Sequence, residues 1–294
     1  MKRVWILLAL MLGALLVVAA VAQYAHLHGG QMPILDPAGP IALGERTVIL
    51  IAFWLSSIVV IPVFATLFFF AWKYRADGPG AHITHAPNWD HDSPLIEFLW
   101  WLVPAVIIFA LGILAWQSSH ALDPWKPLPG NDTLTVEVVA LDWKWLFIYP
   151  AQGIASVNEL ELPENVPVHF ELTADAPMNS FWIPALGGQI MVMPGMDTQL
   201  NLEADKTGVF NGFSGNISGE GFSGMAFSAN SVSQNDFDIW VAAARRSPAL
   251  TQDAYAALAK PSENNPPTTY TLSDPQLFDS TMMKYMMPPM STTP

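Results

Sequence analysis

The chain has 294 residues, of which 52% are hydrophobic and only 13% are charged, and it contains 12 Trp. This composition is too apolar for a wholly soluble protein and indicates membrane-spanning segments beside a folded domain. The formal net charge of −13 excludes nucleic-acid binding, because neutralising phosphates requires clustered Lys and Arg. The lack of cysteine excludes disulfides, thiolate metal sites and a cysteine nucleophile, so any metal would need His, Met or carboxylate ligands.

Residues 1–22 begin with Lys2 and Arg3, continue as an apolar run and contain an A-x-A pattern from Ala20 to Ala22. These features predict a signal peptide, and the length of the apolar run leaves an uncleaved membrane helix as the alternative. Either outcome would export the residues that follow.

Two further apolar runs, residues 48–72 and 95–116, are each long enough to cross a bilayer as a helix. They predict a transmembrane hairpin, and Pro62 is expected to kink its first helix. The connecting loop, about residues 73–94, begins with a Lys and an Arg, so the positive-inside rule places it in the cytoplasm. The large C-terminal region would then be extracytoplasmic.

Residues 133–232 form a series of short runs with period-two alternation, separated by Pro, Gly and Asn. Many short strands at this spacing predict a β-sandwich or a small barrel. The predicted strands are TLTVEVVAL, WKWLFIY, VNELELP, PVHFELTA, GQIMVM, TQLNLEA, GVFNGF and MAFSANSV.

After the predicted strands, helical stretches are expected over residues 236–246 and 252–260. A last helix is expected after Ser273, where S-x-x-Q with a Pro in the first turn is typical of a capping box. Residues 264–269 indicate an exposed linker. The expected division of the chain is a signal peptide or membrane helix over 1–22, an exported segment over 23–47, a helical hairpin over 48–116, a β-sandwich over 117–232 and a helical, aromatic-rich segment over 233–294.

The expected exported region is strongly acidic. From residue 117 onward it contains seven Lys and Arg and 19 Asp and Glu, which leaves a net formal charge of −12. Dispersed carboxylates that keep the domain soluble explain this charge more simply than a basic partner protein does. The Met-rich C-terminal end is interpreted as adaptable packing or a frayed tail rather than a copper site, because no His or Cys lies near it.

Four segments narrow the interpretation: LDWKWLFIYP (141–150), MNSFWIP (178–184), GQIMVMPGM and GFSGNISGEGFSGM. Together they resemble subunit II of the heme–copper respiratory oxidases, and they are most similar to the cytochrome bo-type ubiquinol oxidase branch. The similarity extends over nearly the whole chain, from LDPAGPIALGER to the aromatic-rich end. It implies an α+β membrane protein, in which transmembrane helices precede an exported cupredoxin-like β-sandwich and a short helical C-terminal segment.

The members of this family that oxidise cytochrome c carry a two-copper centre, built from one His and the motif C-x-E-x-C-x-x-x-H-x-x-M. On this chain the corresponding positions are Asn179, Ser214, Asn216, Ser218, Phe222 and Met225. Only Met225 keeps the residue type of the motif. Hydroxyls and a phenyl ring cannot replace bridging thiolates and terminal imidazoles. The loop is therefore predicted to keep the spacing of a copper site but to lack its ligands.

A subunit II without this centre cannot pass electrons from cytochrome c to the large subunit. The resemblance implies that ubiquinol delivers electrons directly to hemes in subunit I, which also holds a copper ion, and that the complex pumps protons while it reduces oxygen to water. This chain would bind no cofactor or metal and would dock no cytochrome c. It would act as a scaffold in contact with subunit I, subunits III and IV and membrane lipid, in the bacterial inner membrane with its C-terminal domain in the periplasm.

Glu97 lies near the cytoplasmic start of the second predicted span, where a carboxylate is costly to bury and is therefore a functional candidate. By resemblance it matches the Glu of I-E-x-x-W that stands at the mouth of a proton channel in subunit I. The alternative is an interfacial side chain without such a role. Trp143 and Trp145, which flank Lys144, are interpreted as core and interface aromatics.

Two other features are interpreted without a functional site. His82, His85 and His91 in the predicted cytoplasmic loop have spacings compatible with zinc, but the neighbouring prolines favour a solvated loop. Gly30 stands where close relatives have a lipidated Cys, so this chain is not expected to be acylated there.

A rival prediction is a membrane-anchored cupredoxin-like binding or copper-delivery protein. Such a protein would need clusters of His and Met on the sandwich, and the predicted strands contain His169 as their single His. A cytochrome c oxidase subunit with an altered metal site is excluded by the missing cysteines.

Overall fold

The computed structural model describes residue 23 and residues 36–75, 93–130 and 132–286. The chain divides into two compact units, one formed by Leu43–Lys126 and the other by the rest of the chain. The predicted signal peptide, the lipidation position at Gly30 and the three loop histidines lie outside the described residues.

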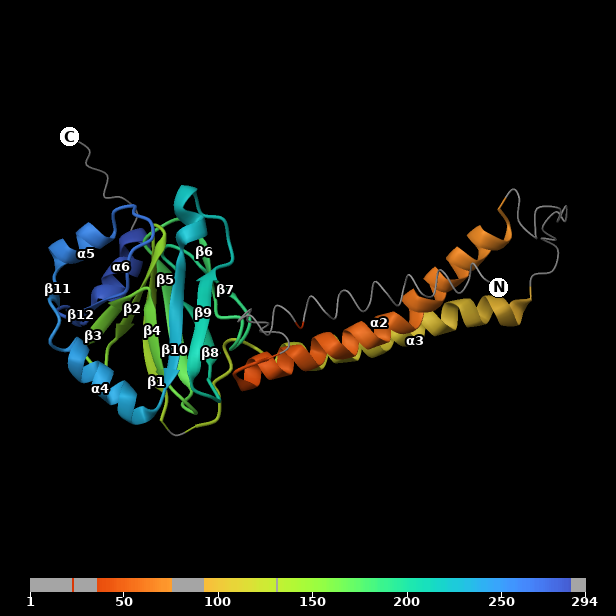
Figure 1. Ribbon diagram of the computed structural model, residues 1–294, viewed down its shortest axis with the longest axis horizontal. Coiled ribbons are helices and arrows are strands. Elements are labelled where there is room, and N and C mark those ends of the chain that lie inside the picture. The colour runs from red at the N-terminus through yellow and green to blue at the C-terminus, as the bar shows by residue number, and fades with distance from the viewer. Residues whose placement is uncertain (1–22, 24–35, 76–92, 131, 287–294) are drawn as a thin grey trace. The chain divides into compact units, whose positions relative to one another are not determined.

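Two long helices, α2 (Pro40–Lys73, 34 residues) and α3 (Pro94–Ala121, 28 residues), make up most of the smaller unit (Figure 1). Both predicted apolar runs lie inside them. Apolar side chains surround each helix on all sides, so neither helix has a polar face that suits water. The most apolar window of each helix has no buried residue, and Trp100 and Trp101 are among the exposed side chains. By length and composition, both helices are able to cross a membrane.

Helix α2 continues through Pro62 without a break. Its ribbon bends along its length in Figure 1, as expected when a proline removes one backbone hydrogen bond inside a helix.

The larger unit contains a β-sandwich of two sheets, which confirms the predicted architecture (Figure 1). The strand order is β11-β12-β3-β2-β1-β5-β8 in the seven-stranded sheet and β4-β10-β9-β6-β7 in the five-stranded sheet. The strands of the first sheet are β1 (Leu134–Leu141), β2 (Lys144–Tyr149), β3 (Ile154–Val157), β5 (Val168–Ala174), β8 (Thr198–Leu202), β11 (Ala249–Leu250) and β12 (Thr268–Leu272). Those of the second are β4 (Glu159–Pro163), β6 (Asn179–Trp182), β7 (Ile190–Val192), β9 (Gly208–Ser214) and β10 (Ala226–Val232).

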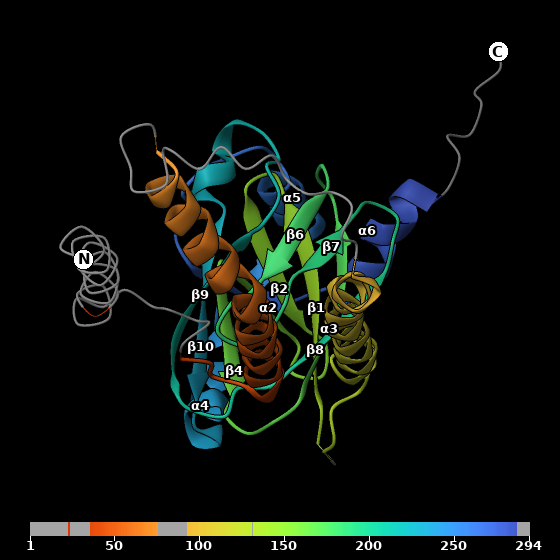
Figure 2. The ribbon, with the colours of Figure 1, turned by 90° about the vertical axis from the view of Figure 1, so that its right-hand side faces the viewer.

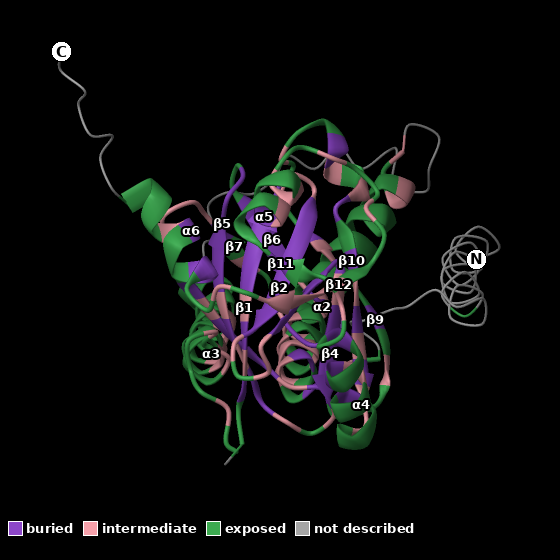
Figure 3. Cartoon of the chain, turned by 90° about the vertical axis from the view of Figure 1, so that its left-hand side faces the viewer, coloured by how far each residue is buried: buried purple, intermediate pink, exposed green. Residues whose placement is uncertain are grey.

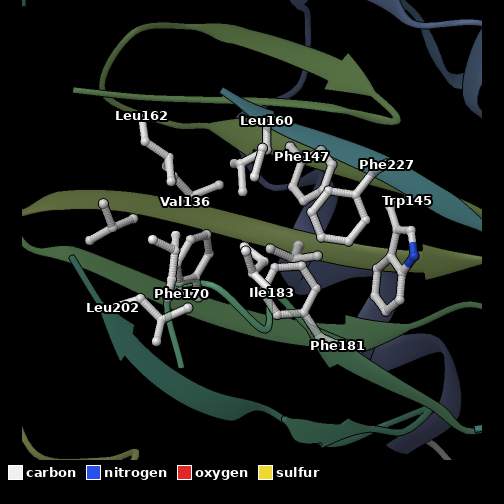
Figure 4. Packing of buried hydrophobic residues seen from close by; sticks show 14 of the residues in the cluster. Val136, Trp145, Phe147, Leu160, Leu162, Phe170, Phe181, Ile183, Leu202 and Phe227 are labelled. Atoms are coloured by element: carbon white, nitrogen blue, oxygen red, sulfur yellow. The ribbon is translucent and has the colours of Figure 1, made fainter. Parts of the chain in front are cut away.

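The main core lies between the two sheets and is rich in aromatic rings (Figure 4). Alternate residues of β2, including Trp145 and Phe147, point into it and are fully buried. The rings of Phe181 and Phe227 stack with centroids 5.3 Å apart, and Trp145 meets Phe181 edge-on at 5.3 Å. Strand β6, which contributes Phe181, was not among the predicted strands.

A second buried cluster covers the other face of the seven-stranded sheet. Its members are Val139, Leu141, Leu146, Ile148, Ala155, Val157, Leu250, Tyr255, Leu277 and Phe278. Every residue of β2 and β3 is therefore buried, and the period-two alternation read for these strands does not separate an inner face from a solvent face. The C-terminal segment is the cause, because it supplies the last four members of the cluster.

The C-terminal segment contains three helices, α4 (Gln234–Ala244), α5 (Gln252–Leu258) and α6 (Leu277–Met286), whose outward sides are exposed (Figure 3). It is not only helical, since β11 and β12 extend the seven-stranded sheet. The prediction of a linker over residues 264–269 is wrong at its end, because β12 begins at Thr268 and pairs with β3.

Two predicted boundaries also differ from the structure. The run VNELELP is divided between β3 and β4 by Asn158, whose φ of 54° is left-handed and whose side-chain Oδ1 accepts from the Trp145 N–H at 2.9 Å. The expected capping box at Ser273 is replaced by Asp274, whose carboxylate accepts from the Gln276 N–H at 2.9 Å. Helix α6 consequently begins at Leu277.

Candidate functional site

The positions aligned with the copper ligands lie at the ends of two neighbouring strands. Asn179 begins β6 and Ser214 ends β9, two strands that are labelled in Figure 2. They pair antiparallel, with Phe181 opposite Ser214. This pairing brings the first two positions together, and the Ser214 hydroxyl lies 3.0 Å from Asn179 Oδ1. Both residues are buried, with 1% and 3% of their surface exposed.

The loop between β9 and β10 folds back on itself. It contains one 3-10 turn, η1 (Glu220–Gly224), after which the Met225 N–H donates to the Phe222 carbonyl at 3.0 Å. The Met225 carbonyl accepts from the Ser214 N–H at 3.3 Å, and the Met225 side chain is buried in the main core. Backbone bonds and core packing thus hold the loop in place without a metal.

The remaining aligned positions are attached to different degrees. Asn216 donates from Nδ2 to the Met178 carbonyl at 2.9 Å, and its backbone N–H lies 3.4 Å from Ser214 Oγ. Ser218 Oγ is buried and has no hydrogen-bond partner among the described residues. Hydrogen bonds therefore join Asn216 to the strand ends that carry Asn179 and Ser214. The Ser218 hydroxyl takes no part in these hydrogen bonds.

The side chains at these positions do not fit a two-copper centre. Apart from the Met225 thioether, they supply amides, hydroxyls and a phenyl ring, where copper requires thiolates and imidazoles. Asn179 also uses its amide internally, since Nδ2 donates to the Pro177 carbonyl at 2.8 Å. Within the part of the chain that the structure describes, no three His, Cys, Asp or Glu side chains come close enough to hold a metal ion.

Trp143 lies against this loop and not in the centre of the core. It has a left-handed φ of 61°, and its indole packs on the backbone at Gly219 and Gly221. A Cβ at Gly221 would overlap the indole, so the close approach requires glycine there. Trp145, two residues on, is fully buried in the core. The two Trp thus have different environments, although both are direct neighbours of Lys144 in the sequence.

Lys144 is fully buried on the outer side of β2, a placement that sequence reasoning missed. Its Nζ donates to the carbonyls of Leu258 and Lys260, both at 2.8 Å, at the C-terminal end of α5. Burial lowers the pKa of Lys144, and the nearby carboxylate of Asp142 opposes that change. A cation at a helix C-terminus is favourable, so Lys144 attaches the C-terminal segment to the sandwich.

Asp175 forms a second attachment that the sequence did not indicate. Its side chain is only 3% exposed and accepts from Lys284 Nζ at 2.6 Å and from the Tyr285 hydroxyl at 2.5 Å, both on α6. The Tyr255 hydroxyl of α5 donates to its other oxygen at 2.9 Å. One buried carboxylate at the end of β5 therefore holds two helices of the C-terminal segment.

Glu97 lies in the first turn of α3 and is exposed. Its backbone N–H donates to the Ser93 carbonyl at 3.1 Å, so the helix start fixes its backbone. Glu97 belongs to the helical unit, whereas the copper-loop positions belong to the sandwich unit.

Comparison with known proteins identifies two families within the sandwich unit. Residues 152–232, within the sandwich, match the family described as cytochrome C oxidase subunit II, periplasmic domain. Residues 245–289, which include α5, β12 and α6, match the COX Aromatic Rich Motif. The predicted subunit II sandwich with its aromatic-rich extension is thereby confirmed.

Curated relatives extend the similarity over most of the chain. The chain is 50% identical to cytochrome bo(3) ubiquinol oxidase subunit 2 of Pseudomonas putida, over 88% of this chain and 82% of the relative. It is 49% identical to the protein of that name from Pseudomonas aeruginosa, over 88% and 78%. It is 44% identical to ubiquinol oxidase subunit 2 of Acetobacter aceti, over 88% and 84%. The chain therefore belongs to the ubiquinol oxidase subunit 2 family.

Proposed function

We propose that this chain is subunit II of a proton-pumping quinol oxidase that reduces oxygen to water with electrons from ubiquinol. Membership of the ubiquinol oxidase subunit 2 family supports the reaction and the substrate. The observation that carries the proposal is the donor set of the β9–β10 loop, in which a Ser–Asn pair stands where copper ligands would be needed.

The absence of copper ligands assigns electron transfer to another subunit. Oxidation of ubiquinol releases electrons and protons, and oxygen takes up both to form water. Hemes and a copper ion in subunit I would carry this chemistry, and no cytochrome c would dock on this chain. The chain itself would act as a scaffold in contact with subunit I, and also with subunits III and IV and membrane lipid.

Two apolar helices and a sandwich of the periplasmic type support a position in the bacterial inner membrane. We propose the hairpin over 48–116 as the membrane part, the sandwich over 117–232 and the segment over 233–294 as periplasmic, and the loop at about 73–94 as cytoplasmic. Alkaline phosphatase fused after Pro150 should then be active and fused after Gly80 inactive. The reverse pattern would contradict this topology.

Glu97 is proposed to supply a carboxylate to the proton entry path of subunit I. A carboxylate in the first turn of a spanning helix is exposed on this chain and free to meet a partner helix. Glu97→Gln should slow oxidase turnover by roughly tenfold or more while heme content stays unchanged, because an amide cannot carry protons. Glu97→Asp should slow it less, and Asp123→Asn, beyond the end of α3, serves as the matched control. Full turnover in the Gln variant would leave Glu97 as an interfacial side chain.

Purification of the complex from native membranes tests the main proposal. Co-purification with a heme-containing large subunit and ubiquinol-dependent oxygen uptake are expected. Recovery of the chain alone, loaded with copper, would instead support the rival copper-delivery function.

The lost-copper hypothesis has a constructive test in the purified chain. Asn179→His, Ser214→Cys, Asn216→Glu, Ser218→Cys and Phe222→His together restore thiolates and imidazoles. This variant should become coloured and bind two coppers, whereas one or two changes should not suffice, because the metals would be under-coordinated. The unmodified chain should show no visible absorption after incubation with copper salts. Stoichiometric copper in the unmodified chain would overturn the proposal.

A further inference from the structure

Acidic side chains meet at the contact between the seven-stranded sheet and the first turn of α6. Glu137 of β1 and Glu171 of β5 are direct neighbours in the parallel strand pair. Helix α6 packs on both strands and carries Asp279 in its first turn. Phe278 beside it is buried in the same cluster as Val139, which lies two residues from Glu137 on the same face of β1. These contacts place the three carboxylates at one interface.

The groups around this interface offer little positive charge to Glu137. His169 is a base on the neighbouring strand β5, but its Nε2 lies 3.5 Å from Glu171 Oε1 and its Nδ1 lies 2.9 Å from the Asn201 amide oxygen of β8. On β2 the residue opposite Glu137 is the apolar Ile148. Among the described residues of α6, Lys284 is the one cation, and it is held by Asp175.

Glu137 itself is poorly placed to carry a negative charge. Its Oε2 is buried and has no hydrogen-bond partner among the described residues. Burial first, and then the charges of Glu171 and Asp279, raise the pKa of Glu137 from 4.5 to about 7. The neutral carboxyl of Glu137 is therefore favoured below about pH 7 in the docked state.

We propose that Glu137, Glu171 and Asp279 form a proton-dependent contact that holds the first turn of α6 on the sheet in acid and weakens when Glu137 ionises. Glu137 binds its proton more tightly when α6 is docked than when α6 is undocked. Docking is fully stabilised below pH 4.5, loses stability as the pH rises to about 7, and changes no further above that. The attachment at Asp175 near the other end of α6 would remain, so the helix should loosen from its N-terminal end.

This contact lies wholly within the sandwich unit and does not depend on the proposed role of Glu97. The proposed periplasmic location would expose it to the side on which pumped protons are released. A test within the chain therefore remains valid even if the oxidase function were rejected.

Hydrogen–deuterium exchange of the full chain in detergent, corrected for the intrinsic effect of pH, measures the opening of residues 277–286. Opening in the wild type should increase roughly tenfold between pH 5 and pH 8, less than the full shift would give because Glu137 is partly solvated. Glu137→Gln should make this opening independent of pH. Peptides from α4 provide the internal control, since no carboxylate of this interface lies on that helix.

Asp279→Asn provides a second, exposed substitution that should reduce the pH step without removing it. Glu220→Gln in η1 is the matched control and should keep the whole step. Equal opening at pH 5 and pH 8 in the wild type, or a full step in Glu137→Gln, would overturn the proposal. If the Gln variant does not fold, an unchanged step in Asp279→Asn overturns it alone.

Discussion

The β9–β10 loop and the contact between the sandwich and its C-terminal segment both bury polar groups, but of different kinds. In the loop, the neutral side chains of Asn179 and Ser214 bond to each other. At the C-terminal contact, the charged side chains of Lys144 and Asp175 bond to helices from the end of the chain. A neutral hydrogen bond contributes about 1 kcal/mol, whereas a hydrogen bond to a charged group contributes about 1.5–3 kcal/mol. The stability of the domain should thus depend more on the C-terminal contact than on the loop.

The largest effect is expected from Asp175→Ala. This change leaves the hydroxyls of Tyr255 and Tyr285 without their charged acceptor and should reduce the free energy of unfolding by about 3 kcal/mol. Thermal unfolding followed by near-ultraviolet circular dichroism measures the loss. Lys206→Ala, which removes the exposed pair with Asp36 at 2.7 Å, is the control and should cost less than about 1 kcal/mol. Equal losses of unfolding free energy in the two variants would contradict the conclusion that the C-terminal contact dominates the stability of the domain.

A smaller loss is expected from Lys144→Met, which keeps an unbranched apolar side chain in the buried position. The carbonyls of Leu258 and Lys260 lose their charged donor, so the free energy of unfolding should fall by about 2 kcal/mol. Limited proteolysis should also remove the segment after α5 faster. The exposed Lys126→Met is the control, and unchanged proteolysis in Lys144→Met would show that this attachment is not needed.

The smallest effect is expected in the loop, from Ser214→Ala. The variant loses the bond to Asn179 and should be destabilised by about 1 kcal/mol in denaturant unfolding. Ser223→Ala on the exposed side of η1 controls for the change of residue type. A loss as large as that of Asp175→Ala would mean that the loop, and not the C-terminal contact, dominates stability.

Local sequence patterns determined much of the architecture. The apolar runs that lie within α2 and α3 were readable because a bilayer requires a long uninterrupted apolar segment, whatever its neighbours are. Most strands of the sandwich were readable from short apolar runs between turn residues. The resemblance to subunit II also predicted which residues between Ser214 and Met225 stand at the copper-ligand positions, and their residue types exclude the thiolates and imidazoles that copper needs.

Only the tertiary structure decided which residues meet across the sequence. Lys144 and Leu258, or Asp175 and Lys284, are more than a hundred positions apart, so no local pattern pairs them. The same reason explains why β2 is buried on both faces and why β12 joins a sheet, since the C-terminal segment must first fold back over the sandwich. The environment of Glu137 also depends on that fold, because Glu171 of β5 is its neighbour in the sheet and the charge of Asp279 comes from α6.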